Sequence, residues 1–283
     1  MLSRYFTRRN VTLFATNSSL AFASISGLVQ LVLAVYPLGA LHGGRALFAI
    51  IAISASFGVL KSLPRTAIGR NFRDPYFKIS IKKGDLFDES SHLVVGFTDT
   101  FDTDSFDSEI ISPGSVQGQF LQKVYAGDLS ALDRDLEEAL RGCEVGAVEP
   151  VQEKVKGKLI RYPMGTVVVL GRSETRHYCV AYSRMGNNLV AQSSVDALWI
   201  SLSALWNVID DTGHRGRVSI PIIGSELARV DNLGYQEIAR MIILSFVARS
   251  RESLVARELT LIVHPQDSAR IDMNEMDFFL NSL

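Results

Sequence analysis

The feature that most constrains this chain is a stretch without charged side chains at residues 10–44, close to the N-terminus. Within this stretch, residues 20–36 are almost all apolar, and a few residues before them complete the about 20 helical residues that a bilayer core requires. A second apolar run follows at 46–60, after a break that contains Pro37 and Gly39. The pattern predicts a hairpin of two transmembrane helices within a membrane region 1–62. The expected helices cover about residues 15–36 and 41–61.

The basic residues around the hairpin predict its orientation. Arginines precede the first helix, Lys61 and Arg65 follow the second, and Arg45 alone lies near the connection. Because cytoplasmic loops carry an excess of basic residues, we expect both termini in the cytoplasm. Small residues in both runs also allow close packing between the two helices or with copies from other chains.

Two other interpretations of this region compete with the hairpin. Ala21-Phe22-Ala23 is similar to a signal-peptide cleavage site, but polar residues 16–19 interrupt the apolar core before it. A helical hairpin buried in a soluble core would carry a polar face on each helix, and these runs have none. We therefore favour the transmembrane hairpin.

The pattern changes after the hairpin to that of an α/β domain. Residues 63–76 are basic and contain two prolines, which predicts a linker, and residues 77–283 alternate short apolar runs with amphipathic helices. This alternation predicts a three-layer α/β domain. The expected strands are 77–82, 92–97, 165–170, 177–182, 218–223 and 259–263. The expected helices contain 120–125, 129–140, 198–209, 238–246 and 273–280.

Charge and motif content exclude several functions. The formal net charge is −1, which does not favour a nucleic-acid partner. Cys143 and Cys179 lie far apart and the five histidines show no ligand spacing, so we expect no metal and no disulfide scaffold. The acidic residues between 99 and 109 are interpreted as a solvated loop. Signatures of P-loop, dinucleotide-binding, zinc-protease and serine-hydrolase sites are absent, and no catalytic residue is assigned.

Three loops are candidates for ligand binding, because each is expected to follow a strand directly, and ligands gather at the carboxyl ends of strands in open α/β sheets. They cover residues 84–87, 115–119 and 222–229. Backbone N–H groups in such loops, with a helix N-terminus behind them, can hold phosphate. The order of the three loops along the chain is more specific than any one of them.

Taken together, the loops resemble those of a macrodomain, an ADP-ribose-binding α/β/α fold with a mixed sheet, over about residues 77–268. Gly84-Asp85-Leu86 is similar to the family's G-D-I motif, which implies that Asp85 accepts from the adenine amino group and that Leu86 lies beside the ring. Residues 115–118 stand in the place of the first phosphate loop. Residues 221–227 resemble the second, P-x-x-G-T-G, which implies that Gly224 and Ser225 donate N–H groups to the diphosphate.

The sequence departs from the macrodomain pattern at two places. Residues 96–103 replace the family's N-A-A-N, so the asparagine that orients the distal ribose in hydrolytic members is absent. Glu226 stands where the second phosphate loop has a glycine. Both departures favour binding with altered specificity over hydrolysis.

The order of two apolar helices and a divergent macrodomain resembles the TM-macro effectors of Thoeris antiphage systems over the whole chain. This resemblance implies no cofactor and a ligand that is ADP-ribose or an ADP-ribose conjugate, such as histidine-ADP-ribose, made by a TIR-domain partner. Binding would drive homo-oligomerisation, disruption of the lipid bilayer and abortive infection. The implied location is the bacterial inner membrane, in which the chain is multi-pass.

The expected ligand-binding residues follow from the three loops and from the end of the second strand. They are Asp85, Leu86, Thr98, Asp99, Ser115, Val116, Gln117, Gly118, Ile223, Gly224, Ser225, Glu226, Leu227, Ala228 and Arg229. Two other functions stay open. A membrane-tethered ADP-ribosyl hydrolase would need a general base, for which Asp99 or Asp102 is the candidate, and a scaffolding protein would leave the pocket empty.

Overall fold

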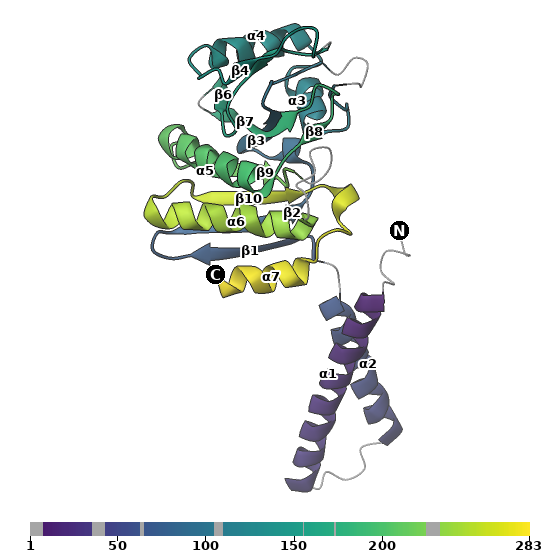
Figure 1. Cartoon of the computed structure of the whole chain (residues 1–283). Coiled ribbons are helices and arrows are strands. Elements are labelled where there is room, and N and C mark those ends of the chain that lie inside the picture. The colour runs from purple at the N-terminus through teal and green to yellow at the C-terminus, as the bar shows by residue number, and fades with distance from the viewer. Residues whose placement is uncertain are drawn as a thin grey trace. The chain divides into compact units, whose positions relative to one another are not determined.

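The computed structural model describes residues 8–35, 43–62, 65–104, 110–154, 156–172, 174–224 and 233–283. The chain divides into two compact units, Met1–Arg65 and Thr66–Leu283. The first unit contains two helices, and the second is an α/β domain that holds the rest of the described elements (Figure 1).

The first unit consists of α1 (Arg8–Val35) and α2 (Gly43–Ser62), which pack against each other. A Cβ atom built on Gly58 would lie 1.9 Å from Ser18 Oγ, so the glycine lets the two backbones approach closely. Large apolar side chains remain exposed on both helices, as in Leu28, Leu31 and Phe48. The two apolar runs of the sequence thus lie in helices, as predicted, and part of their apolar surface is not covered within this unit.

The predicted membrane location requires a correction. Among the residues that the structure describes, no helix has both the length and the apolar character needed to cross a membrane. The spans predicted at 15–36 and 41–61 are therefore not supported, and the multi-pass location in the bacterial inner membrane was wrong. The reason is composition: α1 carries the polar residues 16–19, and the apolar run 46–60 of α2 is shorter than the about 20 residues of a span.

The second unit is built on a mixed sheet, which contains eight strands within the described residues. The strand order is β1-β2-β10-β9-β3-β7-β6, and β8 pairs with β7. Strands β2, β10, β9, β3 and β7 run parallel, whereas β1, β6 and β8 pair antiparallel with their neighbours. The strands are β1 (Ala67–Phe72), β2 (Phe77–Lys83), β3 (His92–Thr98), β6 (Val167–Arg172), β7 (Thr175–Met185), β8 (Ala191–Gln192), β9 (Arg217–Pro221) and β10 (Glu258–Val263).

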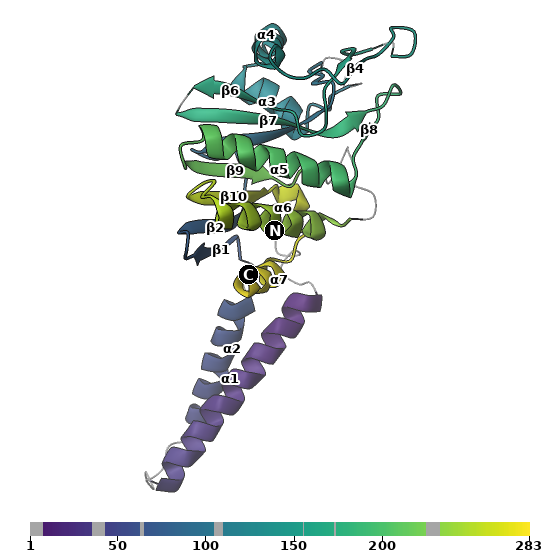
Figure 2. The same cartoon turned by 60° about the vertical axis from the view of Figure 1, so that its left-hand side comes forward.

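Helices cover parts of both faces of this sheet (Figures 1 and 2). Successive residues of a strand point to opposite faces. Val94 of β3 therefore joins the core under the helices α5 (Val195–Thr212) and α6 (Tyr235–Glu252), whereas Val95 joins the core under α3 (Val116–Val124) and α4 (Leu129–Leu140). The last helix, α7 (Met273–Ser282), packs against β1 and the first of these cores.

The stretch predicted as a linker, 63–76, contains an element that the sequence analysis missed. Residues 67–72 form β1, the edge strand, which pairs antiparallel with β2 along its whole length. Its inward residues Ile68 and Phe72 are buried, and Phe72 stacks on Phe77 at 4.6 Å. Glycine and arginine within β1 hide the alternation of buried and exposed residues in the sequence. The basic residues of this stretch therefore led to its interpretation as a linker, which was wrong for 67–72.

A second, two-stranded sheet lies outside the main one. It consists of β4 (Ala147–Val148) and β5 (Ile160–Arg161), which pair antiparallel. The chain between α4 and β6 makes this excursion before it returns to the sheet. The excursion positions two basic side chains, Lys154 and Arg161, that reach the loop after β3.

Candidate functional site

A cavity of about 350 Å³ opens at the carboxyl ends of the parallel strands. Its walls come from the segments that follow β2, β3, β7, β9 and β10, and from the start of α3. This is the edge at which open α/β sheets collect their ligands. Eight of the predicted residues lie in its walls: Asp85, Leu86, Thr98, Ser115, Val116, Gln117, Ile223 and Gly224.

Asp85 lies where β2 gives way to the short 3₁₀ helix η2 (Leu86–Asp88). Its carboxylate caps that helix by accepting from Phe87 N at 2.9 Å, and it forms an ion pair with Lys123 of α3. Burial raises the pKa of Asp85, but the hydrogen bond and charge of Lys123 and the Phe87 N–H outweigh it, so the pKa lies below its usual value. The side chain is therefore a fixed anionic acceptor on the cavity wall.

The first predicted phosphate loop forms the N-terminus of α3. Ser115 is the N-cap, and its hydroxyl accepts from Gly118 N at 3.1 Å and donates to Ser112 O at 2.6 Å. Gly118 does not line the cavity. Its role is close packing, since a Cβ atom there would lie 2.4 Å from Ser112 O. The helix N-terminus that results can favour negative charge at the cavity.

The second predicted phosphate loop follows β9. Pro221, Ile222, Ile223 and Gly224 line the cavity, and Gly224 has a φ of 86°, a left-handed conformation that favours glycine. The remaining predicted residues of this loop lie outside the described residues. They are Ser225, Glu226, Leu227, Ala228 and Arg229.

Asp99 does not line the cavity, although it was expected near the distal ribose. Its carboxylate is buried and accepts from Arg161 Nη1 at 3.0 and 2.8 Å and from Met185 N at 2.8 Å. Arg161 also donates to Asn187 Oδ1 at 2.9 Å and pairs with Glu149. Burial lowers the pKa of Arg161, and the two carboxylates raise it by more, so it stays charged. Asp99 therefore holds the end of β7 through the main chain of Met185.

A second buried ion pair lies beneath the same wall. Asp102 and Lys154 are almost fully buried, with Nζ 3.0 Å from Oδ2. Lys158 N donates to Asp102 Oδ1 at 2.5 Å, and Lys154 donates to Lys158 O at 2.5 Å. The main-chain carbonyl of Asp102 accepts from the side chain of Gln117, which lines the cavity. Asp99 and Asp102 thus stabilise the structure behind the cavity wall, and the interpretation of their stretch as a solvated loop was wrong at these two buried residues.

The sequence analysis missed several lining residues. Most are apolar or small and lie in segments without a motif, and no single residue among them signals a site. They are Gly96, Ile110, Ile111, Ser112, Tyr182, Ser183, Met185, Leu189, Val190, Ala191, Tyr235, Ile262, His264, Gln266 and Asp267. Those at or after the end of a parallel strand, such as Ser183, Met185 and His264, could have been found from that position.

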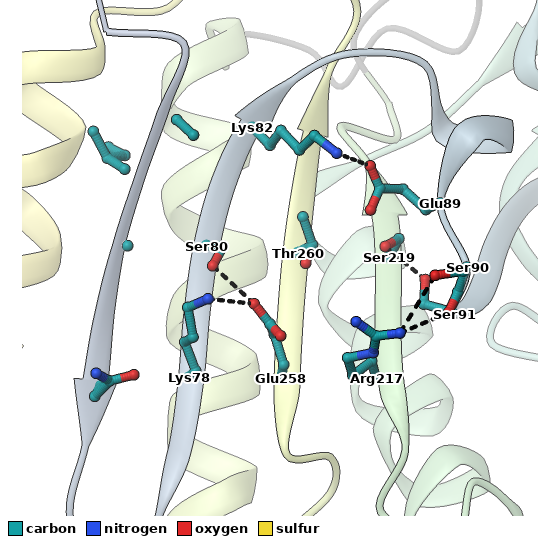
Figure 3. A pocket seen from close by; sticks show the side chains of 14 residues that line it. Lys78, Ser80, Lys82, Glu89, Ser90, Ser91, Arg217, Ser219, Glu258 and Thr260 are labelled. Atoms are coloured by element: carbon teal, nitrogen blue, oxygen red, sulfur yellow. Dashed lines mark hydrogen bonds and ion pairs between the residues drawn. The ribbon is translucent and has the colours of Figure 1, made fainter.

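A second hollow, of about 460 Å³, lies over the face of β1, β2, β10 and β9 (Figure 3). Its charged side chains pair with one another: Lys78 lies 2.9 Å from Glu258, and Lys82 lies 2.5 Å from Glu89. Arg217 donates to Ser90 O at 3.1 Å. Because these groups already have partners, and because the hollow lies over the face of the sheet and not around the loops that follow the parallel strands, we place the candidate site in the first cavity. Within the described residues, no cluster of His, Cys, Asp and Glu side chains could hold a metal ion.

The mixed sheet, the helices on both faces and the cavity at the strand ends define the second unit as a macrodomain. Two solved macrodomains from Oceanobacillus iheyensis, one with MES bound and one with ADP, each cover 77% of this chain and 100% of their own, at a TM-score of 0.50. They are 11% and 12% identical to it, so they show the fold alone. The predicted macrodomain-like fold is confirmed.

The particular family follows from the sequence comparison. The model of the family described as "Thoeris protein ThsA, Macro domain" matches residues 79–264, and the chain belongs to this family. A relative, "Thoeris protein ThsA" from Bacillus amyloliquefaciens (strain Y2), is 24% identical over 207 residues, which cover 71% of this chain and 67% of the relative. The resemblance to a Thoeris macrodomain protein is confirmed at this level.

Proposed function

We propose that the cavity binds ADP-ribose or an ADP-ribose conjugate and that this chain is a ligand-gated effector of Thoeris antiphage defence. The observation that carries the proposal is the meeting of Asp85, the N-terminus of α3 and Gly224 around one cavity. The family membership supports the defence role. A solved protein of the same fold is described with ADP, which is the nucleotide part of the proposed ligand.

The cavity walls suit the parts of such a ligand in order. The Asp85 carboxylate, held by Lys123, would accept from the adenine amino group, with Leu86 beside the ring. The α3 N-terminus and the backbone of Ile223 and Gly224 would face the diphosphate, because N–H groups at a helix start and in a glycine loop favour anions. The distal part would then lie at the ends of β3 and β7.

The proposal assigns the making of the ligand to a TIR-domain partner, and a histidine conjugate of ADP-ribose is the form we favour. Binding would shift the chain from a resting state to a homo-oligomer. Since a ligand shifts an equilibrium only by its difference in affinity for the two states, the oligomer must bind the ligand more tightly. Equal affinities in the two states would exclude this gate.

The competing function is an ADP-ribosyl hydrolase. Its candidate bases, Asp99 and Asp102, have their carboxylates engaged by Arg161 and by Lys154, and neither lines the cavity. A base that activates water must reach it at hydrogen-bond distance. This arrangement supports binding over turnover.

One experiment separates the two functions. The 283-residue chain is titrated calorimetrically with ADP-ribose and incubated with ADP-ribosylated protein under the same conditions. We expect saturable binding, weakened about tenfold or more by Asp85→Ala, and no release of ADP-ribose. Release at a rate above that of a blank would favour the hydrolase, and the absence of any binding would refute the proposed ligand.

A further inference from the structure

The amino ends of the parallel strands carry arginines that have no acidic partner. Arg172 and Arg176 belong to the hairpin that leads into β7, Arg215 and Arg217 lie at the start of β9, and Arg257 precedes β10. All except Arg176 are exposed, and within the described ranges none of these arginines forms an ion pair. We call this group the basic edge.

The turn before β9 holds part of the basic edge in a fixed arrangement. His214 and Arg215 both have a positive φ, 49° and 56°, which is uncommon for residues that carry a Cβ atom. The start of β10 supports this turn, since Arg257 N donates to Arg215 O at 3.3 Å and to Gly216 O at 3.1 Å. Arg176 Nη2 lies 3.3 Å from His214 Nε2. Basic side chains from the starts of β7, β9 and β10 are therefore gathered at one edge.

Positive charge is in excess at the basic edge. The acidic residues in the same segments are Glu174, Asp211 and Glu258. Glu258 pairs with Lys78 at 2.9 Å, and the other two are exposed and form no ion pair with a described residue. From β10 to β7 the basic edge spans three strand spacings, about 14 Å, which is a broader area than one small anion covers. The basic edge is therefore suited to an extended anionic surface.

A second uncovered surface lies on the excursion between α4 and β6. Val145, Val148, Val151 and Ile160 are exposed, by 50%, 66%, 63% and 42%. Val148 and Ile160 pair across β4 and β5, so their side chains share one face of this small sheet. The next residue, Arg161, is buried on the opposite face, so the apolar face points outward. Exposed apolar side chains grouped in this way mark a contact site for a partner.

Acidic residues accompany these apolar side chains. They are exposed and form no ion pair with a described residue: Glu137, Glu138, Glu144 and Glu153. The same stretch has only two exposed basic residues, Arg141 and Lys156. Burial raises the pKa of Tyr162 and the charge of Glu137 adds to this, so the end of α4 lies close to the residue that follows β5. We call these glutamates and the four apolar residues the acidic-apolar surface.

The two surfaces lie at opposite ends of the strands. The excursion lies at the carboxyl ends, because Arg161 contacts Asp99, which follows β3, and Asn187, which follows β7. The basic edge lies at the amino ends of the same sheet. The two surfaces can therefore meet between two copies of the domain but not within one. Because such a contact joins unlike surfaces, it is heterologous.

We propose that a second copy of this chain docks its acidic-apolar surface on the basic edge of the first, so that the chain assembles head to tail. Charge complementarity carries this choice of partner, because the chain itself supplies both halves of the contact. The glutamates would pair with the guanidinium groups, and the alkyl parts of the arginines would cover the valines. The proposal rests on the homo-oligomer proposed above and names its contact surfaces.

The ligand cavity and the acidic-apolar surface share a support. Arg161 of the excursion binds Asp99, whose carboxylate accepts from the N–H of Met185, a residue of the cavity wall. A ligand that contacts this wall therefore also stabilises the position of the excursion and of the surface that docks. In this way the assembled state gains the higher ligand affinity that the gate requires.

Sedimentation velocity of the 283-residue chain, with and without excess ADP-ribose, measures the assembly. We expect the mean mass to increase with protein concentration, and ADP-ribose to lower the concentration at which this happens. An increase from about 50 to about 500 mM NaCl should weaken the assembly at least about tenfold, because salt screens the charges of the two surfaces.

Charge reversal assigns the contact to these surfaces. Arg172→Glu with Arg257→Glu reverses the basic edge, and Glu144→Lys with Glu153→Lys reverses the acidic-apolar surface. Each pair should raise the concentration for half-assembly at least about tenfold. Both pairs should keep the urea midpoint, because all four residues are exposed. Arg172→Lys with Arg257→Lys keeps the charge, so this matched control should assemble as the wild type does.

A mixture of the two reversed chains tests the head-to-tail arrangement itself. The intact basic edge of one chain then meets the intact acidic-apolar surface of the other, so the mixture should assemble although neither chain does so alone. If the reversed chains assemble as well as the wild type, the docking is refuted while the homo-oligomer stands. If the wild type binds ADP-ribose but stays monomeric at every concentration, both are refuted while ligand binding stands. The reversal test applies equally to assembly that concentration alone produces, so it decides the docking even if ADP-ribose does not bind.

Discussion

Lys154 and Asp102 form an ion pair of 3.0 Å in which both side chains are almost fully excluded from water, although 52 residues separate them in the sequence. Removing one partner leaves the other charge buried alone, which costs about 3–5 kcal/mol. Lys154→Ala should therefore lower the free energy of unfolding by about that amount in urea titrations. The double variant Lys154→Met with Asp102→Asn should lose much less, and equal losses in the two variants would contradict this account.

Gly118 should tolerate no side chain. A Cβ atom there would lie 2.4 Å from Ser112 O and 2.8 Å from Pro113 Cα, both main-chain atoms that cannot move cheaply. Gly118→Ala should destabilise the domain by about 1–3 kcal/mol through overpacking, measured as a lower urea midpoint. Gly142→Ala is the matched control, because nothing lies within 4 Å of its Cβ position. A midpoint for Gly118→Ala equal to that of the control would show that the loop adjusts freely.

Two buried histidines should make the fold less stable in mild acid. Burial lowers the pKa of His92 and of His177, and neighbouring positive groups add to this. The unfolded chain, with histidine pKa values of about 6.5, then binds more protons than the folded chain, so stability is complete above that pH and falls as the pH drops below it. Urea unfolding at pH 7.5, 6.5 and 5.5 should show this loss.

A substitution identifies the group responsible for that loss. His92 is buried and its Nδ1 accepts from Arg176 N at 3.1 Å, a hydrogen bond that protonation of Nδ1 would remove. His92→Gln should flatten the decline between pH 7.5 and 5.5. His214→Asn, at an exposed position with a φ of 49° that asparagine accepts, should flatten the decline only slightly, because the His214 charge is a smaller cause of the lowered His92 pKa than burial. An unchanged slope in His92→Gln would assign the effect elsewhere.

Ligand binding should resist mild acid because of Lys123. Burial raises the pKa of Asp85, and the Lys123 contact and the Phe87 N–H together lower it by more, so the carboxylate stays ionised as the pH falls towards 3.8, the usual pKa of an aspartate. The affinity for ADP-ribose should hold between pH 7 and about 5. In Lys123→Met, the Phe87 N–H and the more distant His264 remain to oppose the burial effect, so the Asp85 pKa is higher than in the wild type and the affinity should begin to fall at a higher pH. Calorimetric titrations at pH 7, 6 and 5 measure this. If the affinity changed with pH in the same way in the wild type and in Lys123→Met, Lys123 would have no such role.

Arg161 should restrain the turn between β7 and β8. Its guanidinium joins Asp99, which holds Met185 N, to Asn187 in that turn. Arg161→Lys keeps a charge but cannot make these contacts together. Amide hydrogen exchange of Leu189 and Val190 should accelerate several-fold, whereas amides of β10 in the sheet centre should keep their rates. Unaltered exchange in the turn would show that Arg161 does not restrain this part of the cavity wall.

The sequence carried enough information to place the sheet and the main helices of the second unit. Buried parallel strands appear as continuous apolar runs, and the helix stripes appear at a spacing of three or four residues, so β3, β10 and α4 were all expected within a few residues. Strand β1 and the pair β4 and β5 were not predicted, because short strands and edge strands contain few apolar residues and so give a weak sequence pattern. The prediction of a membrane hairpin was wrong for another reason. The apolar runs form helices, but none of the described helices is both long enough and apolar enough to cross a membrane.

The candidate site was predictable where a motif sits on a strand end. Asp85, Ser115 and Gly224 lie in loops that the strand pattern already placed at one edge of the sheet. Asp99 was misplaced because the sequence cannot show that Arg161, 62 residues later, would turn its carboxylate away from the cavity. Contacts between distant segments decide the direction of a side chain, and no local pattern encodes them.

The excursion between α4 and β6 supplies both counter-ions, Lys154 and Arg161, of the loop that follows β3. That loop consequently depends on contacts with a segment more than 50 residues downstream, and contacts of such long range carry a larger loop-closure cost in folding. A transient local unfolding of the excursion would also remove the partners of two buried carboxylates at once. It would thereby disrupt the wall that faces the distal part of a ligand.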